Sequence, residues 1–91
     1  MNELSRDALV EKADAIQSKA DFDAFTQLLL QDYRCHPDDW GNNTLELFLE
    51  ALAGFVEGMG GYYSNVGERI DMERPGWRVF ADILLAARVY E

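Results

Sequence analysis

Basic residues are scarce in this sequence, which contains eight Lys and Arg against 17 Asp and Glu and has a formal net charge of −9. Proteins that bind DNA or RNA need Lys and Arg to displace counterions from phosphates, and no segment here concentrates them. The same shortage disfavours binding to anionic membranes. We therefore expect neither a nucleic-acid nor a membrane partner. The acidity serves either solubility alone or the attraction of a basic protein, whose association would slow with salt.

Long apolar runs are absent too, and cysteine occurs once, as Cys35. No stretch approaches the roughly 20 apolar residues of a membrane-spanning helix. Residues 1–6 contain no basic stretch leading into an apolar segment, so we expect no secretory signal. A lone cysteine cannot form an internal disulfide, which favours the reducing cytoplasm. Because 48% of the 91 residues are hydrophobic, we predict that residues 1–91 fold as a single domain.

Apolar residues recur at spacings of three and four in several segments, which predicts an all-α fold. The expected helices cover residues 5–15, 18–34, 43–57 and 75–91. Their stripes comprise Leu9, Ala13 and Ile16 in the first, Phe22, Phe25, Leu29 and Tyr33 in the second, and Trp77, Phe80, Ala81, Leu84, Leu85 and Arg88 in the last. Side-chain caps are expected at the starts of the first three, from Ser5, from Ser18 with Asp21, and from Asn43 with Glu46.

The third helix is expected to be the central one, because apolar residues occupy two of its sides. The broad side consists of Leu45, Phe48, Leu49, Leu52, Ala53 and Val56, and the opposite side of Leu47, Ala51 and Phe55. Gly58, Gly60 and Gly61 are expected to stop this helix, since glycine opposes helix propagation. Residues 62–74 then form an irregular loop. The sequence thus predicts a compact bundle of about four helices with an irregular loop between the third and the fourth.

Cys35, His36, Asp38 and Asp39 place four potential metal ligands within five residues. A structural zinc site typically uses two separated ligand pairs, and the sequence has no second cysteine or histidine, so we predict no metal ion and no cofactor. Cys35 beside His36 does not indicate a nucleophile either, because chain neighbours rarely face each other in the required geometry. We find no other catalytic set and expect that the protein is not an enzyme.

Four aromatic residues, Trp40, Tyr62, Tyr63 and Trp77, lie in or beside the predicted loops. Tyr and Trp are common anchors at interfaces but serve equally well as core residues, and the sequence leaves both roles open. The leading hypothesis is a protein-binding module with candidate contacts at Asp38, Asp39, Trp40, Tyr62 and Tyr63. The alternative is a small-molecule-binding or enzymatic domain with a pocket between the last two helices, near Trp40, Tyr63 and Trp77. A self-associating structural protein is a third hypothesis.

Four strings of residues carry a family likeness. They are Trp40-Gly41-Asn42-Asn43-Thr44-Leu45, Phe48-Leu49-Glu50-Ala51-Leu52, Pro75-Gly76-Trp77 followed by Ala81, and Ala86-Ala87-Arg88-Val89-Tyr90-Glu91. Through them, residues 21–91 resemble a family of small bacterial proteins of unknown function, which implies no particular activity. In size, charge and helix pattern the chain is also similar to small acidic immunity-type proteins, which neutralise toxins by binding them. That likeness implies an inhibitor of a basic partner, which is the more specific form of the protein-binding hypothesis.

Overall fold

The computed structural model describes the backbone of residues 2–90 and the side chains of residues 8–90. Within that range the chain forms four α-helices and no strand. The helices are α1 (Asn2–Asp14), α2 (Lys19–Cys35), α3 (Leu45–Asn65) and α4 (Trp77–Ala87), with a short 3-10 helix, η1 (Pro37–Asp39), between α2 and α3. The prediction of an all-α bundle of four helices is therefore confirmed.

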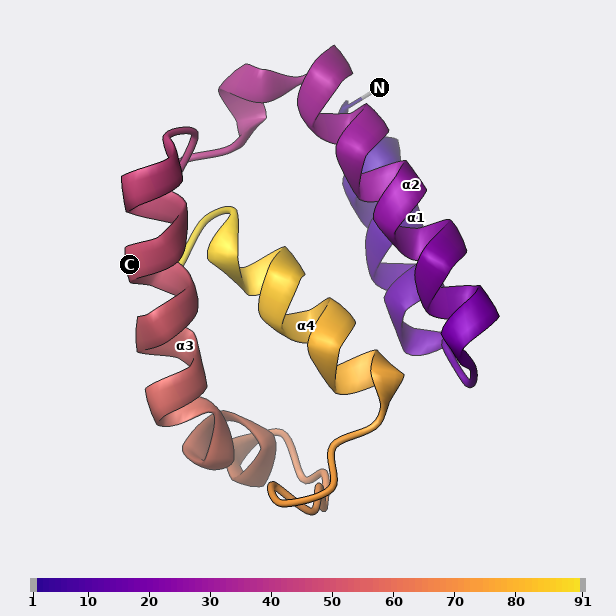
Figure 1. The fold of residues 1–91 in the computed structure, drawn as a ribbon, viewed down its shortest axis with the longest axis vertical. Coiled ribbons are helices and arrows are strands. Elements are labelled where there is room, and N and C mark those ends of the chain that lie inside the picture. Colours follow the sequence, from indigo (N-terminus) through magenta and orange to yellow (C-terminus); the bar gives the residue numbers. More distant parts are fainter. Residues whose placement is uncertain (1, 91) are drawn as a thin grey trace.

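Helix α4, and not α3, is the central helix. It packs against α1, α2 and α3, and Figure 1 shows it between the α1–α2 pair and α3. Ala81 and Ala87 of α4 have no exposed surface, and their small side chains let neighbouring segments approach closely. Two hydrophobic clusters flank the helix, one containing Leu9, Ala13, Ile16, Phe25, Leu29, Trp40 and Ala81 and the other Phe55, Met59, Tyr63 and Val79. The prediction that the third helix is central was wrong.

The first two helices largely follow the sequence pattern. Leu9 and Ala13 of α1 are buried, as is Ile16 just after the helix, which begins at Asn2, earlier than expected. The expected cap by Ser5 falls outside the described side chains. At the start of α2, Ser18 Oγ accepts a hydrogen bond from the backbone N–H of Asp21 (3.1 Å). The Asp21 carboxylate in turn accepts from the N–H of residue 17 (3.0 Å), so the cap is reciprocal as predicted but reaches one residue further back.

Helix α3 buries the side that we expected to be the minor one. Its buried residues are Ala51, Phe55, Met59 and Tyr63, which repeat every four residues. The broad apolar side is largely exposed because, among the described helices, only α4 packs along α3. The helix begins at Leu45, and Thr44 caps it by accepting from the N–H of residue 47 (3.2 Å). The predicted cap at Asn43 was therefore one residue too early.

The glycines at positions 58, 60 and 61 do not stop α3, which continues to Asn65. Tertiary packing on α4, through Met59 and Tyr63, outweighs the weak helix propensity of glycine. The chain turns instead at Gly67, whose φ of 79° lies in the left-handed region that glycine adopts without strain. The irregular loop is consequently shorter than expected, and begins after the helix at residue 66.

Helix α4 begins after Gly76 and ends at Ala87. The sequence pattern had suggested that it continues to Glu91, which lies outside the described residues. Residues 88–90 instead form a turn, in which the N–H of Tyr90 donates to the carbonyl of Ala86 (2.7 Å).

A buried polar cluster joins this turn to α2. The indole N–H of Trp40 donates to Asp32 Oδ2 (2.8 Å), and a guanidinium N–H of Arg88 donates to the same oxygen (3.3 Å). The side chains of Asp32 and Arg88 are only 6% and 7% exposed. Breaking a buried ion pair on one side is strongly destabilising because a desolvated charge remains. The Asp32–Trp40–Arg88 cluster therefore fixes the end of α2, the η1 segment and the end of α4 relative to each other.

Asn42 also connects the segment before α3 to the turn after α4. Its side-chain amide donates to the carbonyls of Ala87 and Tyr90, both at 3.0 Å, and its backbone N–H donates to the carbonyl of Arg88 (2.8 Å). These bonds satisfy carbonyls at the end of α4 and in the turn that follows it. The Trp-Gly-Asn string that carries the family likeness is thus a structural joint between the start of α3 and the end of α4.

We expect Gly58→Ala and Gly61→Ala each to raise the free energy of unfolding by about 0.5–1 kcal/mol. Both residues lie inside α3, and a Cβ atom at either position would meet nothing within 4 Å. Gly54→Ala is the control, because its Cβ would lie 3.1 Å from the Tyr90 ring and the gain should shrink or vanish. Urea denaturation measures all three, and unchanged or lower stability of the first two variants would contradict an uninterrupted α3.

We expect Asp32→Ala to lower the free energy of unfolding by roughly 3–5 kcal/mol, since Arg88 and the Trp40 indole both lose their buried carboxylate partner. Asp32→Asn keeps an acceptor for the indole and should lose less. Asp23→Ala, at an exposed position of the same helix, is the control and should change stability by less than about 0.5 kcal/mol. Equal losses for Asp32→Ala and Asp23→Ala would show that the cluster does not hold the bundle together.

Candidate functional site

The structure divides the predicted contact residues into two groups. Trp40 is 8% exposed and Tyr63 is 2% exposed, so both pack in the core. Tyr62 and Asp38 are exposed, and Asp39 is half-buried. Of the two roles that the sequence left open for the aromatic residues, Trp40 and Tyr63 have the structural one. Tyr63 is therefore removed from the candidate contacts, and Trp40 keeps only a small exposed area.

Trp40, Tyr63 and Trp77 do not line a common pocket, which the alternative hypothesis had required. Trp40 stacks on Phe48, with ring centroids 6.0 Å apart, and Trp77 packs on Phe22 of α2, at 5.3 Å. Tyr63 belongs to the other hydrophobic cluster, between α3 and α4. The three aromatic residues serve three separate contacts. The prediction that they share one pocket was wrong.

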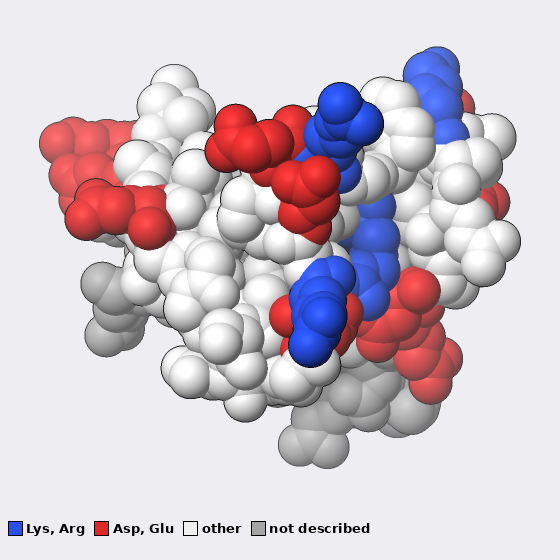
Figure 2. Space-filling view, turned by 90° about the horizontal axis from the view of Figure 1, so that it is seen from below, with Lys and Arg blue, Asp and Glu red and all other residues white. Residues whose placement is uncertain are grey.

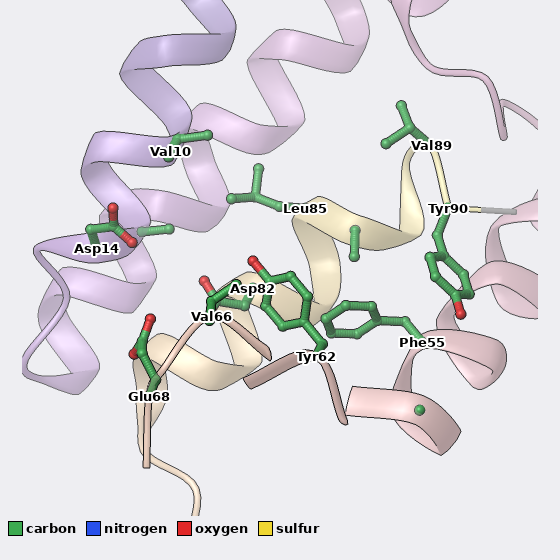
Figure 3. Close-up of a pocket in the computed structure, with 13 residues that line it drawn as sticks. Val10, Asp14, Phe55, Tyr62, Val66, Glu68, Asp82, Leu85, Val89 and Tyr90 are labelled. Atoms are coloured by element: carbon green, nitrogen blue, oxygen red, sulfur yellow. The ribbon is translucent and has the colours of Figure 1, made fainter. Parts of the chain in front are cut away.

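A cavity of about 560 Å³ lies over α4, with walls from α1 and α3 (Figure 3). Asp14, Glu68 and Asp82 contribute carboxylates to its lining. Phe55 and Tyr62 of α3, with Tyr90, contribute aromatic rings. The remaining lining residues are Val10, Ala13, Gly58, Val66, Leu85, Ala86 and Val89. The cavity is thus apolar over most of its wall and acidic on one side.

The acidic side has a polar network of its own. Tyr63 donates a hydrogen bond from its hydroxyl to Asp82 Oδ2 (2.6 Å), and Arg78 Nε lies 3.9 Å from the same oxygen. Arg78 also donates to Glu68. Burial raises the pKa of the Asp82 carboxyl, and the hydrogen bond from Tyr63 and the charge of Arg78 lower it in part. The nearby charges of Asp14 and Glu68 raise the pKa of Asp82 further.

Tyr63 is held in its neutral form. Burial raises the pKa of its phenol well above the ordinary range, and the hydrogen bond to Asp82 and the negative charge of that carboxylate raise it further. A phenol held neutral is not a general base near neutral pH. The role of Tyr63 is structural, because its hydrogen bond to Asp82 holds that carboxylate in place at the edge of the cavity.

A second surface lies on the outward face of α3. Leu45, Leu49 and Val56 are spaced by four and seven residues, so they share one face of the helix, and they are 74%, 52% and 43% exposed. Each is followed in sequence by a glutamate, and these three acids, Glu46, Glu50 and Glu57, form a parallel row. We call these six residues the α3 double row.

No lysine or arginine lies close to the α3 double row in the sequence. Residues 35–68 contain none, whereas they contain six acidic residues. Figure 2 shows acidic side chains without basic ones at the left edge, where α3 lies, while the basic side chains gather toward the middle and right. The surface of α3 is therefore apolar and acidic at once, and no basic residue of its own segment neutralises it.

The α3 double row adjoins an apolar groove of about 410 Å³ between α2 and α3. Leu30 and Tyr33 line it from α2, Leu45 and Phe48 line it from α3, and Trp40 also contributes to its wall. Leu45 belongs to both surfaces and connects them. The exposed apolar area therefore extends from the outward face of α3 across to α2.

The Cys35–Asp39 segment does not gather ligands. Among the described residues, no group of three His, Cys, Asp or Glu side chains is placed to hold a metal ion. Cys35 is an exposed free thiol at the end of α2. In the same range, no helix is long and apolar enough to cross a bilayer.

The residues that organise these surfaces were not among the predicted site residues. Phe25, Leu29 and Asp32 follow one another at spacings of four and three, so Asp32 lies on the buried stripe of α2, and a carboxylate there needs a cationic partner. That signal could have paired it with Arg88, which lies on the apolar face of the last helix. The three carboxylates that line the cavity come from α1, from the loop that follows α3, and from α4. No local sequence pattern could have indicated that they lie close together.

We expect the stability of the protein to fall as the pH rises above about 10, the ordinary pKa of tyrosine. The neutral phenol of Tyr63 is favoured in the folded protein, so its contribution is complete below that pH and is lost as the pH climbs toward the higher folded-state pKa. Urea denaturation at a series of alkaline pH values should show a steeper loss for the wild type than for Tyr63→Phe.

Asp82→Asn provides the second arm of this test. It removes the carboxylate that helps hold the proton, so Tyr63 should ionise at a lower pH in the folded variant than in the wild type. Absorbance of tyrosinate records this directly. If Tyr63→Phe removed an ionisation step of the folded wild type near pH 10, the neutral phenol would be ruled out.

Comparison with known proteins gives a family and no activity. The model of a family of unknown function, DUF7660, matches residues 18–91. No curated protein and no solved structure matches the chain significantly. The matched residues cover α2, η1, α3 and α4, and they include the Trp40–Asn42 joint and the buried Asp32–Arg88 pair. The chain therefore belongs to this family of unknown function, DUF7660.

Proposed function

We propose that this protein is a non-enzymatic binding module, and that it docks a basic, amphipathic segment of a partner protein on the α3 double row. The observation that carries the proposal is the pairing of an exposed apolar row with an acidic row on a helix that has no basic residue. Such a surface offers apolar contact and charge attraction to the same ligand.

Each row has a separate physical role in the docking. Leu45, Leu49 and Val56 present apolar area that a partner can remove from water, at about 25 cal/mol per Å². Contiguous exposed apolar surface of this kind is a mark of interaction sites. Glu46, Glu50 and Glu57 supply charge that steers a basic partner and disfavours acidic ones.

The groove beside Trp40 extends the docking surface. Leu45 is shared by the groove and the row, so a helix lying along α3 can insert an apolar side chain between Leu30 and Phe48. The Asp32–Trp40–Arg88 cluster holds the Trp40 wall rigid, which reduces the ordering that binding would otherwise require. Docking on a preformed groove is therefore favoured over folding on binding.

The more specific form of the proposal is an inhibitor of a basic toxin, in the manner of immunity-type proteins. A net charge of −9 on a chain of 91 residues supports fast association with a cationic target. We further propose that the protein acts in the cytoplasm, where the exposed Cys35 thiol stays reduced.

We expect a synthetic lysine–leucine peptide, patterned as an amphipathic helix, to bind the protein with an affinity that falls as salt is raised. The variant Glu46→Lys with Glu50→Lys should weaken this binding by at least about tenfold at physiological salt. The control variant Asp23→Lys with Glu73→Lys makes the same change in net charge away from α3 and should weaken binding by less than about threefold. Calorimetric titration measures all three.

Two results would contradict the proposal. If both double variants weakened peptide binding equally, binding would depend on the net charge of the protein and not on the α3 double row. Full binding by Leu45→Ser with Leu49→Ser would mean that the apolar row makes no contact. For the inhibitor, basic proteins encoded beside this gene are the natural targets: co-expression should relieve their toxicity, and the variant altered at Glu46 and Glu50 should not.

A further inference from the structure

A glycine forms part of the wall of the cavity over α4. Gly58 lines it from α3, and a Cβ atom at this position would meet no atom within 4 Å. Glycine inside a helix is less stable than alanine by about 1 kcal/mol, and alanine would fit here without a clash. Packing therefore does not require glycine at position 58. What glycine provides there is space within the cavity.

The walls of the cavity suit a cation on an apolar stem. In Figure 3, Asp14, Glu68 and Asp82 lie toward one side, while Phe55 and Tyr90 lie toward the other. No lysine, arginine or histidine is among the described residues that line it. Aromatic rings and aliphatic side chains accept the methylene groups of a ligand, and ring faces also attract cations.

The acidic side is not neutralised by its arginine. Arg78 forms ion pairs with both Glu68 and Asp82, so a single positive charge serves two carboxylates. Asp14 of α1 adds a third carboxylate, whose charge is felt at Asp82. Negative charge therefore remains in excess at this end of the cavity, and Asp82 is half-buried there. A cationic group would relieve the repulsion among the three acids.

We propose that this cavity binds an organic cation, an ammonium or guanidinium group on an unbranched aliphatic stem. The cationic head lies among Asp14, Glu68 and Asp82, and the stem runs over Leu85 toward the ring of Phe55. The volume of about 560 Å³ is that of a small-molecule site. The same chemistry is found in a free aliphatic amine and in a lysine or arginine side chain of a protein partner.

This site is separate from the α3 double row. Phe55, Gly58 and Tyr62 face the cavity, whereas Leu45 and Leu49 lie on another face of the same helix. The inference therefore stands without the proposed docking function.

The test is a calorimetric titration of the wild type with hexylamine, with hexanol as the neutral probe of the same length. We expect hexylamine to bind more tightly than hexanol, because only the amine meets the carboxylates. Gly58→Leu fills the cavity and should weaken hexylamine binding by at least about tenfold. Gly61→Leu is the matched control: it also has open space on α3, does not line the cavity and should stay within about twofold of the wild type.

Charge is tested by Asp14→Asn, which should weaken hexylamine binding by about threefold to tenfold, against Asp23→Asn as the exposed control on α2. Urea denaturation verifies that each variant is folded. Equal binding of hexanol and hexylamine, or full binding by folded Gly58→Leu, would overturn the proposal.

Two further probes, spermidine and the lysine–leucine peptide, distinguish a free amine from a side chain of a protein partner as the source of the cation. Loss of spermidine binding alone in Gly58→Leu supports a free amine as the ligand. Loss of peptide binding as well supports a side chain of the partner. Full peptide binding by the variant altered at Glu46 and Glu50 would overturn only the docking proposal, whereas equal binding of hexanol and hexylamine would overturn only this one, so the two proposals fail separately.

Discussion

The arrangement of the helices depends on the hydrogen bonds that the buried carboxylate of Asp32 accepts. One oxygen of this buried group accepts hydrogen bonds from the Trp40 indole and from Arg88, and so joins the end of α2, the segment after η1 and the end of α4. Apolar packing alone is non-directional, whereas a desolvated ion pair tolerates few geometries. With Asn42 closing the same joint from outside, α3 has a fixed starting point and a fixed angle to α4.

That joint leaves α3 packed on one side only, and both proposed sites follow from this. Its outward face keeps an apolar row beside an acidic one, because no second layer of helices covers it within residues 2–90. On its inner side, α3 meets α4, while α1 packs on α4 elsewhere, and the space between α1 and α3 is the cavity. An α3 covered on more than one side, as we expected from the sequence, would not leave both of these surfaces open.

Periodicity was sufficient to predict the four helices and the buried stripes of α1 and α2, because those helices obey local rules of spacing and capping. It was insufficient for α3. Leu45 and Leu49 looked like core residues, yet Met59 and Tyr63 are buried instead, since the choice of side is made by the partner helix. The prediction that Gly58, Gly60 and Gly61 stop the helix failed for the same reason, because tertiary packing outweighs the weak helix propensity of glycine. For the site, the acidity was foreseeable from the composition, but neither the exposure of Tyr62 nor the gathering of carboxylates from three distant segments could be read from local patterns.

The central position of α4 also bears on how the chain is made. Synthesis on the ribosome delivers α1 and α2 first, and these can pair with each other as they emerge. The long helix α3 emerges next with its apolar residues unshielded, because the helix that covers them comes last in the order of synthesis. The nascent chain therefore passes through an interval in which Phe55, Met59 and Tyr63 are available to chaperones, and it completes its core only when α4 arrives.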